Sequence, residues 1–231
     1  MNPAEASLPK SAMAVMAHCR TGGEDANFFP TPVWAARAIG HRILQLDPEA
    51  RTCWEPACGA GHMALGLQDA FDTVYQSDLC LYGDHVLHDF IGEAPSPFRA
   101  DWIVTNPPFG DNIEPFIRRA YAEARRGVAL LMRAGVMEGQ GRYGLIYQDC
   151  PLTLWCPFAE RVPMHRGRWE ADGSSAAFYA LYVWIKPVAR ARQMMVSVND
   201  GWWPGVLPFA PGQEARWHRD SDLALAVGGG R

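Results

Sequence analysis

Short apolar runs alternate with helical patterns along most of this chain, and this alternation limits the possible folds more than any other feature. The runs predict strands over residues 52–54, 73–76, 86–88, 101–105, 128–132, 161–164 and 177–185, and the patterns predict helices over residues 32–46, 62–70, 113–126 and 141–148. Strands that alternate with helices form a mostly parallel sheet that helices cover on both faces. We therefore expect an α/β fold with a mostly parallel seven-stranded sheet, in which residues 167–175 join the last two strands into an antiparallel edge hairpin.

Composition divides the chain into three parts. Residues 1–27 are rich in Ala, Gly and small polar residues without a clear period, which predicts a flexible N-terminal arm. Residues 28–187 contain all the expected strands and helices and form the predicted main domain. Residues 188–231 shift to Gly, Pro and Trp, and we expect a partly irregular C-terminal extension. A length of 231 residues, of which 48% are hydrophobic, is enough for one full-sized domain with a core.

Several sequence features favour a cytoplasmic location and none favours a membrane. No apolar run is long enough to span a bilayer, and the N-terminus lacks the charged and apolar regions of a signal peptide. The six cysteines have no CxxC spacing, so we expect reduced and mostly buried thiols. The net charge of −4 argues against a high-affinity, non-specific nucleic-acid binder but leaves room for a local basic face.

The tetrapeptide Asn106-Pro107-Pro108-Phe109 directly follows an apolar run that is typical of a buried strand. Two consecutive prolines cannot donate backbone hydrogen bonds, so they form a rigid turn at the end of that strand. Asn106 Oδ1 and the Pro107 carbonyl can both accept hydrogen bonds from an amine, and Phe109 can stack on a ring. The pattern favours a grip on a flat ring that carries an NH2 group. A proline-rich loop with a capping Asn is the alternative.

A second candidate cluster follows the first expected strand. Glu55-Pro56-Ala57-Cys58-Gly59-Ala60-Gly61 is a glycine-bearing turn at the carboxyl end of a strand, where α/β sheets bind ligands. Asp78 ends the next strand, and an acidic residue at that place commonly binds the hydroxyls of a ribose. Asp89-Phe90 ends the third strand, where the carboxylate could bind an adenine amine and the ring could cover the base.

The same turn disfavours a nicotinamide dinucleotide. The G-x-G-x-x-G pattern is incomplete because Ala64 stands where the last glycine would be, and the Glu55 carboxylate would repel a pyrophosphate. A ligand with positive charge and no phosphates fits better, and S-adenosylmethionine carries a sulfonium, an ammonium group and a ribose. The alternative for Glu55 is a surface residue at a strand end.

Two other groups of residues are candidates for binding. His85, His88 and Asp89 look like a metal cluster, but no further Cys or His residues have ligand spacing, so we expect no metal site. Three arginines before and at the start of the expected hairpin turn are candidates for contacts to a substrate phosphate backbone, namely Arg161, Arg166 and Arg168.

In their order along the chain, these motifs resemble those of the S-adenosylmethionine-dependent adenine-N6 DNA methyltransferases. The motifs are Phe28-Phe29-Pro30-Thr31-Pro32, the turn from Glu55 to Gly61, Asp78, Asp89-Phe90 and Asn106-Pro107-Pro108-Phe109. Later segments, among them Leu131-Met132-Arg133 and Arg161-Val162-Pro163, resemble the small phage and prophage members of that group. The resemblance covers about residues 28–186. It implies a Rossmann-like class I methyltransferase fold with residues 28–187 as the methyltransferase domain.

The resemblance also implies a role for each motif. The residues that would bind S-adenosylmethionine are Phe29, Thr31, Glu55, Pro56, Ala57, Gly59, Gly61, Asp78, Leu79, Asp89 and Phe90. Catalysis would fall to Asn106, Pro107, Pro108 and Phe109, which would hold a target adenine flipped out of a duplex.

The chain departs from the family pattern in two ways. Glu55 replaces the usual Asp, and the chain has little room for a large target-recognition domain, which leaves the sequence specificity open. The Asn106-Pro107-Pro108-Phe109 turn does not by itself separate DNA, RNA and protein substrates. A partner protein could therefore supply target recognition, and the sequence does not determine the oligomeric state. The alternatives to DNA are adenine in RNA and a glutamine amide in a protein, although a glutamine methylase more often has Tyr at position 109. An inactive cofactor-binding subunit is a further alternative, against which the intact Asn106-Pro107-Pro108-Phe109 turn argues.

Overall fold

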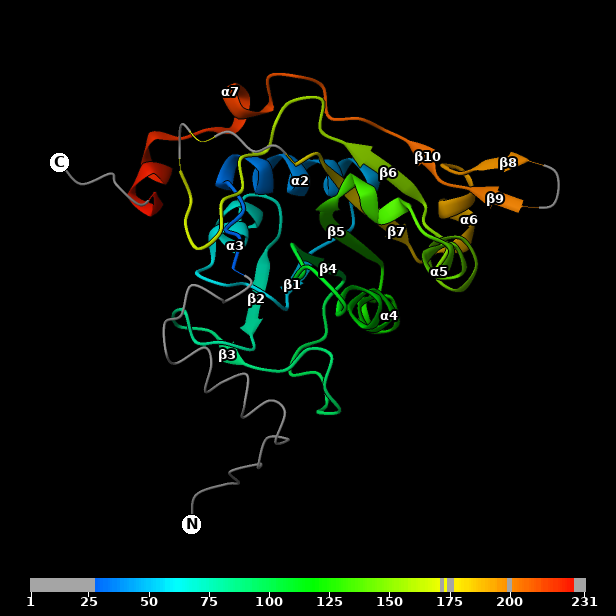
Figure 1. Cartoon of the computed structure of the whole chain (residues 1–231), viewed down its shortest axis with the longest axis horizontal. Coiled ribbons are helices and arrows are strands. Elements are labelled where there is room, and N and C mark those ends of the chain that lie inside the picture. Colours follow the sequence, from blue (N-terminus) through cyan, green and yellow to red (C-terminus); the bar gives the residue numbers. More distant parts are fainter. Residues whose placement is uncertain (1–27, 171–172, 174–176, 199–200, 227–231) are drawn as a thin grey trace, which may run out of the picture.

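The fold is built on a central sheet of eight strands in the order β10-β6-β7-β5-β4-β1-β2-β3 (Figure 1). This computed structural model describes residues 28–170, 173, 177–198 and 201–226. The strands of the sheet are β1 (Thr52–Glu55), β2 (Thr73–Asp78), β3 (Val86–Leu87), β4 (Trp102–Thr105), β5 (Gly127–Arg133), β6 (Leu154–Pro157), β7 (Tyr179–Ile185) and β10 (Gly205–Val206). All neighbouring pairs are parallel except those of β7, which runs antiparallel to β5 and to β6. The expected mostly parallel α/β sheet is therefore confirmed.

Helices lie on both faces of the sheet, as Figure 1 shows. The helical elements are α2 (Val33–Leu46), α3 (His62–Leu67), α4 (Ile113–Glu123), η1 (Ala134–Met137), α5 (Gln140–Tyr143), η2 (Gly144–Asp149), α6 (Val188–Arg192), α7 (Gln213–Trp217) and η3 (Asp220–Leu225). A separate two-stranded sheet pairs β8 (Val196–Val198) with β9 (Gly201–Trp203).

Alternation along the central strands separates two hydrophobic clusters, one on each face. In β5, Ala129 and Leu131 pack with α2 and α3, whereas Leu130 and Met132 pack with α4 and η2. Successive side chains of a strand point to opposite faces, so a strand that is buried on both faces must be apolar at every position. This is why β5 and β7 are continuous apolar runs in the sequence, and why their ends are held in fixed positions.

One expected strand is wrong. Residues 161–164 form no regular strand, and the partner of β7 is β6, which ends at Pro157. Pro163 has no N–H for a ladder, whereas Leu154 and Cys156 are buried on one face and pair with β7. The expected antiparallel pair thus exists with a different first strand, and β10 adds an eighth strand beside β6.

The structure tests the sequence predictions for most of the cysteines but not those for the chain termini. The predicted arm, residues 1–27, lies outside the described residues, and the boundary at residue 187 stays a prediction. Cys53, Cys58, Cys150 and Cys156 are free and buried thiols. Cys80, in the loop after β2, is disulfide-bonded, so the expectation of a reduced thiol is wrong for this residue. No helix in the described part of the chain is both long and apolar enough to cross a bilayer.

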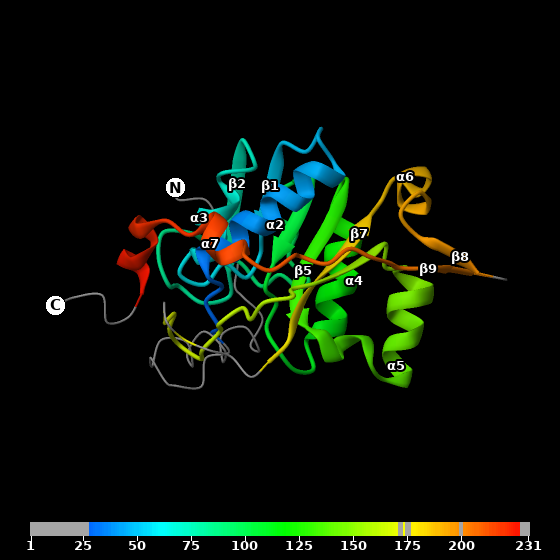
Figure 2. The same cartoon turned by 90° about the horizontal axis from the view of Figure 1, so that it is seen from above.

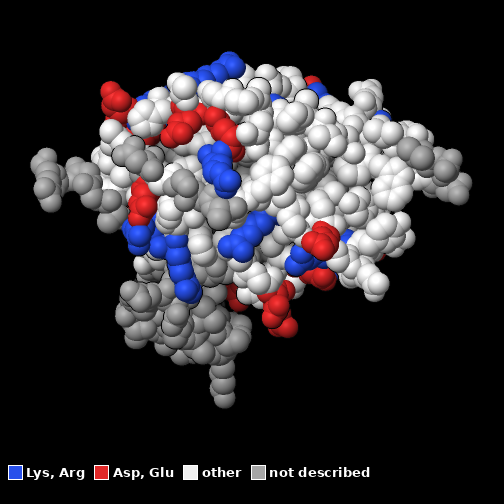
Figure 3. Space-filling view, turned by 45° about the horizontal axis from the view of Figure 1, so that its top comes forward, with Lys and Arg blue, Asp and Glu red and all other residues white. Residues whose placement is uncertain are grey.

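The residues after β7 return along the sheet and then along α2 and α3. Arg37 of α2 donates hydrogen bonds to both oxygens of Asp222 in η3, at 2.6 and 2.7 Å, and to the carbonyl of Trp217. We call residues 212–226 the C-terminal strap. The part of the surface around β8, β9 and β10 shows few charged side chains in Figure 3.

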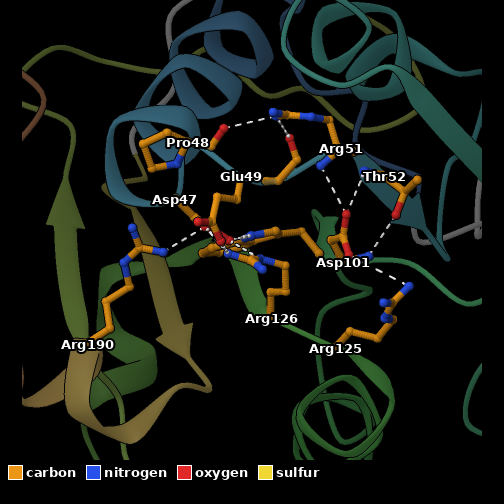
Figure 4. A network of polar contacts seen from close by, with 11 residues as sticks. Asp47, Pro48, Glu49, Arg51, Thr52, Asp101, Arg125, Arg126 and Arg190 are labelled. Atoms are coloured by element: carbon orange, nitrogen blue, oxygen red, sulfur yellow. Dashed lines mark hydrogen bonds and ion pairs between the residues drawn. The ribbon is translucent and has the colours of Figure 1, made fainter.

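A buried carboxylate joins four segments at the amino end of the sheet (Figure 4). Asp47, after α2, accepts hydrogen bonds from Arg126 at 2.6 and 2.7 Å, from Arg190 at 2.7 Å and from the indole of Trp102 at 2.9 Å. Burial alone would raise the pKa of Asp47, but the bonds from Arg126 and Trp102 outweigh it and hold the pKa at about 2. Ion pairs of Asp47 thereby connect the segments at the amino end of the sheet.

Candidate active site

A cavity of about 510 Å³ lies at the carboxyl ends of β1, β2 and β4, where an open α/β sheet binds its ligands. Its walls include the segment before α2, the glycine turn after β1, the loops after β2 and β3, and the turn after β4. The predicted site residues among its lining are Phe29, Thr31, Glu55, Pro56, Ala57, Gly59, Asp78, Leu79, Asp89, Phe90, Asn106, Pro107, Pro108 and Phe109. Motifs that are far apart in the sequence thus surround one space.

The Asn106 side chain is oriented by the chain before α2. Its Nδ2 donates a hydrogen bond of 2.9 Å to the carbonyl oxygen of Phe29, and it lies 3.6 Å from the sulfur of Met164. Oδ1 is buried and has no hydrogen-bond partner among the described residues. A buried acceptor without a partner is costly, so this atom is suited to a donor that a ligand brings.

Phe109 lies among other rings and one cation. Its ring centroid is 4.8 Å from that of Phe29 in an edge-to-face arrangement, and the Arg133 guanidinium lies 4.8 Å from its centroid. Arg133 ends β5, next to β4, and it also hydrogen-bonds the Tyr179 side chain. No carboxylate of the described residues forms an ion pair with Arg133. A cation therefore stands beside the aromatic ring at the end of the Asn-Pro-Pro-Phe turn.

Glu55 is buried, with 2% of its surface exposed, so the alternative of a surface residue at a strand end is wrong. Burial, together with the nearby charge of Asp78, raises the pKa of Glu55 well above its ordinary value. Its Oε2 has no hydrogen-bond partner in the described part of the chain. A buried carboxyl group of this kind gains most from a ligand with positive charge, which would favour its ionised form.

The glycine turn brings the backbone close to the side chains around it. Gly59 has a positive φ of 53°, and a Cβ atom there would lie 2.5 Å from the Phe28 ring. Its N–H donates to Asp78 Oδ2 at 2.8 Å, and Cys80 N–H donates to Oδ1. Phe28 stacks on Tyr82 at 4.8 Å between centroids. Burial raises the pKa of Asp78, and those backbone hydrogen bonds only partly offset the effect.

The third strand end is more open. Asp89 accepts a hydrogen bond from the Ile91 N–H at 3.2 Å, and Phe90 packs edge-on against Trp54. His88 is buried, and burial lowers its pKa. No group of three or more His, Cys, Asp or Glu side chains that could hold a metal ion occurs within the described residues.

Four predicted site residues do not line the cavity. Gly61 has a φ of 83° and is the N-cap of α3, so it contributes to the conformation of the turn without lining the cavity. Arg161, Arg166 and Arg168 are exposed on the loop between β6 and β7. That loop nevertheless touches the site, because Gly167 N–H donates to the Phe28 carbonyl at 2.8 Å and Met164 contacts Asn106. Figure 2 shows the loop and the segment before α2 at the same end of the sheet.

Sequence reasoning missed His62, Tyr82 and Asn112, which line the cavity. Phe28 and His88 also line it, but Phe28 was named only as part of a motif and His88 only as a metal candidate. His62 is the first residue of α3, and burial lowers its pKa. Its position directly after Gly61 could have drawn attention to it. Tyr82 and Asn112 stand in loops without any pattern that would single them out.

The donors and acceptors of the cavity fit S-adenosylmethionine. Glu55 provides a buried carboxyl group for a cationic amino-acid end, Asp78 lies where a ribose is bound in such sheets, and the cavity has the size of a small-molecule pocket. The close approach of Gly59 to Phe28 leaves no room there for a side chain, as a ligand-cradling turn requires.

The fold is that of the class I S-adenosylmethionine-dependent methyltransferases. A Listeria monocytogenes protein of that class is 12% identical, with a TM-score of 0.58 over 90% of this chain and 75% of that chain. The methyltransferase subunit of a type I restriction-modification system from Streptococcus thermophilus is 9% identical, with a TM-score of 0.54 over 94% of this chain. The match spans 58% of the Streptococcus subunit. No protein-family model and no curated protein matches the sequence. The expected Rossmann-like class I methyltransferase fold is confirmed.

Proposed function

We propose that this protein transfers a methyl group from S-adenosylmethionine to the N6 amine of adenine in DNA. The observation that carries the proposal is the Asn106 amide, whose Nδ2 is held by the Phe29 carbonyl while Oδ1 has no partner among the described residues. An acceptor that is fixed in this way can bind an exocyclic amine. Residues 28–187 would form the catalytic domain.

The chemical task of Asn106 is to make a weak nucleophile reactive. The lone pair of an adenine amine is delocalised into its ring. Hydrogen bonds from the amine to Asn106 Oδ1 and to the Pro107 carbonyl favour a pyramidal nitrogen whose lone pair is localised. Because both acceptors are fixed before the substrate arrives, the reaction needs little reorganisation. S-adenosylmethionine supplies a methyl group on a sulfonium. The nitrogen would form the new bond to the methyl carbon as the sulfur–carbon bond breaks, and the methylated amine would then lose a proton to solvent.

The remaining walls would bind the cofactor. Glu55 would bind the ammonium group, Asp78 the ribose hydroxyls, and Asp89 with Phe90 the adenine. Phe29 and Thr31 would border the methionine end. The raised pKa of Glu55 supports this assignment, because burial destabilises the ionised carboxylate and a cationic ligand would stabilise it.

A nucleic-acid substrate is favoured by the cation beside the catalytic turn. Arg133 could contact a phosphate near the flipped base while Phe109 stacks on that base. Arg161, Arg166 and Arg168 lie on the loop that contacts Asn106 through Met164, and we propose them as further phosphate contacts. RNA is the alternative substrate with the same chemistry. A partner protein that supplies target recognition is compatible with the net charge of −4, which gives this chain little general affinity for nucleic acid.

Transfer of labelled methyl from S-adenosylmethionine tests the proposal directly. Duplex DNA, single-stranded DNA, RNA and a protein extract are offered in parallel, with wild-type protein and Asn106→Ala. We expect label in DNA that digests to N6-methyladenine, and a loss of about 100-fold or more in Asn106→Ala. Cofactor affinity, measured by calorimetry, should stay within about threefold, because Asn106 acts on the target amine and not on the cofactor. Equal rates for the two proteins would contradict the mechanism.

A further inference from the structure

The orientation of the Asn106 amide is set by two groups that can only accept hydrogen bonds. The first is the Phe29 carbonyl oxygen, 2.9 Å away, and the second is the thioether sulfur of Met164, 3.6 Å away. A carbonyl oxygen has no proton to donate, so the amide atom that faces it must be the nitrogen. The amide oxygen is thereby forced to the other side, where it is buried and has no partner among the described residues that line the cavity.

Both acceptors come from segments far from β4 in the sequence. Phe29 precedes α2, and Met164 lies in the loop between β6 and β7 and is itself buried. The same two segments are bonded to each other by Gly167 N–H and the Phe28 carbonyl. The two acceptors are therefore held in place relative to one another, and not only relative to Asn106.

We infer that the Phe29 carbonyl and the Met164 thioether form an orientation lock that makes position 106 specific for an amide and excludes an ionised carboxylate. Met164 is a positioning residue in this inference, since it acts through Asn106. The inference rests on the proposed function for its catalytic consequence, but the lock itself is a property of the fold.

The lock has a distinct consequence for the isosteric variant Asn106→Asp. An ionised carboxylate would put an oxygen, in place of Nδ2, against the Phe29 carbonyl oxygen, and the two would repel each other. A protonated carboxyl group restores the native pattern, because its O–H donates to Phe29 and its carbonyl oxygen faces the amine. The pKa of the carboxyl group introduced by this variant should therefore lie well above the usual range for Asp. The variant should transfer methyl groups only at pH values at which that carboxyl group is protonated.

The pKa of the introduced carboxyl group can be measured without any activity. Asn106→Asp protein labelled with 13C at Asp carboxyl groups is titrated by NMR, and the resonance that is absent from wild-type protein is followed. We expect its pKa to lie about two units or more above the ordinary value of about 3.9. Asn112→Asp is a comparison within the same cavity, but Asn112 is the N-cap of α4, where the helix dipole would lower the pKa of a carboxyl group. The lock is therefore overturned if the carboxyl group of Asn106→Asp titrates at or below the ordinary value of about 3.9.

The rate gives a second readout. Above the raised pKa, the ratio of Asn106→Asp to wild-type turnover should rise about tenfold for each unit by which the pH is lowered. The titratable and charged groups that line the cavity or adjoin Phe109 and Met164 are Glu55, Cys58, His62, Asp78, Tyr82, His88, Asp89, Arg133 and His165. They are common to both proteins, so the ratio isolates position 106. A variant as active as wild type at pH 8 would refute the lock.

The two proposals can fail separately. If wild-type protein methylates nothing while the carboxyl group of Asn106→Asp keeps a raised pKa, the lock stands and the proposed function is wrong. If wild-type protein methylates adenine while that carboxyl group titrates normally, the function stands and the lock is wrong.

Met164→Leu tests the second acceptor of the lock. The variant keeps the side-chain volume and removes the sulfur, so its turnover should fall by about twofold to fivefold with the KM for S-adenosylmethionine unchanged. A change in KM alone would count against a role through Asn106.

Discussion

The burial of Glu55 predicts that the proposed binding of a cationic ligand depends on pH. Its pKa is raised by burial and by the nearby Asp78, so without a cation the carboxyl group tends to stay protonated. A cationic ligand prefers the ionised carboxylate, and its affinity should rise as the pH rises through the raised pKa of Glu55.

Glu55→Gln should remove this dependence. The amide cannot ionise, so the affinity for S-adenosylmethionine should fall by about tenfold or more at neutral pH and should vary less with pH than in wild-type protein. Isothermal titration calorimetry from about pH 5.5 to 8.5 would compare the pH dependence of the affinity in the two proteins. Asp78, His62 and His88 also titrate near the cavity, but they are unchanged in the variant. Parallel pH profiles for the two proteins would show that Glu55 is not the group responsible.

Gly59 has a backbone conformation that is strained for an L-residue, and it lines the cavity that we propose as the cofactor site. Gly59→Ala would place a methyl group 2.5 Å from the Phe28 ring at a φ of 53°. We expect a loss of about 1–2 kcal/mol in the free energy of unfolding, because an L-residue is strained there, and a loss of cofactor affinity as Phe28 is displaced. Gly135→Ala is the control, since a Cβ there meets nothing within 4 Å. Equal calorimetric affinities of the two variants would contradict the expected role of Gly59.

The site is predictable from the sequence where residues follow the ends of strands. Glu55, Asp78, Asp89 and Asn106 each stand at or just after a strand of the sheet, and parallel strands bring their carboxyl ends to one edge. Arg133 also ends a strand, but nothing in the sequence indicates that β5 directs it over Phe109, because that contact depends on the packing of the turn after β4. Contacts between loops are set by tertiary structure and leave no period in the sequence.

At the scale of elements, buried strands with continuous apolar runs are predictable, whereas the short strands β6 and β10 escaped prediction although the equally short β3 was expected. β5 and β7 are apolar at almost every position because both of their faces are covered. β6 has only four residues and β10 has two, so their pairing depends on the strands beside them and not on their own sequence. The expected strand at residues 161–164 had a suitable composition but pairs with none of the strands in the described sheet.

The elements at the amino end of the sheet are joined through Asp47, and their stability should depend on pH. The folded-state pKa of Asp47 is about 2, below its ordinary value of 3.8, so its contribution is fully present above about pH 4 and is lost as the pH falls through 2. When the pH is lowered from about 5 to 2, the free energy of unfolding should decrease by about 2 kcal/mol less in Asp47→Asn than in wild-type protein. Urea unfolding across this range would measure it.

Asp72→Asn is the matched control for Asp47. Within the described residues, Asp72 forms an ion pair only with Arg51, at 3.9 Å, and this pair is exposed, so we expect the wild-type pH profile. If the free energies of unfolding of Asp47→Asn and Asp72→Asn have the same pH dependence, the predicted contribution of Asp47 to stability is wrong.

At the scale of the whole molecule, the C-terminal strap is bound to α2 by a buried ion pair. The side chains of Arg37 and Asp222 are 3% and 2% exposed. Asp222→Ala should lower the free energy of unfolding by about 3 kcal/mol, because Arg37 would be left buried with Asp69 as its remaining carboxylate partner among the described residues. Asp220→Ala removes an exposed carboxylate from the same element and should change the stability by less than about 0.5 kcal/mol. Chemical denaturation of both variants tests this, and similar losses would exclude a special role for the buried pair.

The segment from Phe28 to Thr31 belongs to no helix or strand, yet it supplies one wall of the cavity and the carbonyl that orients Asn106. The ladders of the sheet and most of the core do not need these four residues. Folding and the shaping of the cavity are thus divided between different parts of the chain. Evolution or design could rewrite this short stretch to admit another ligand while the scaffold beneath it stays the same.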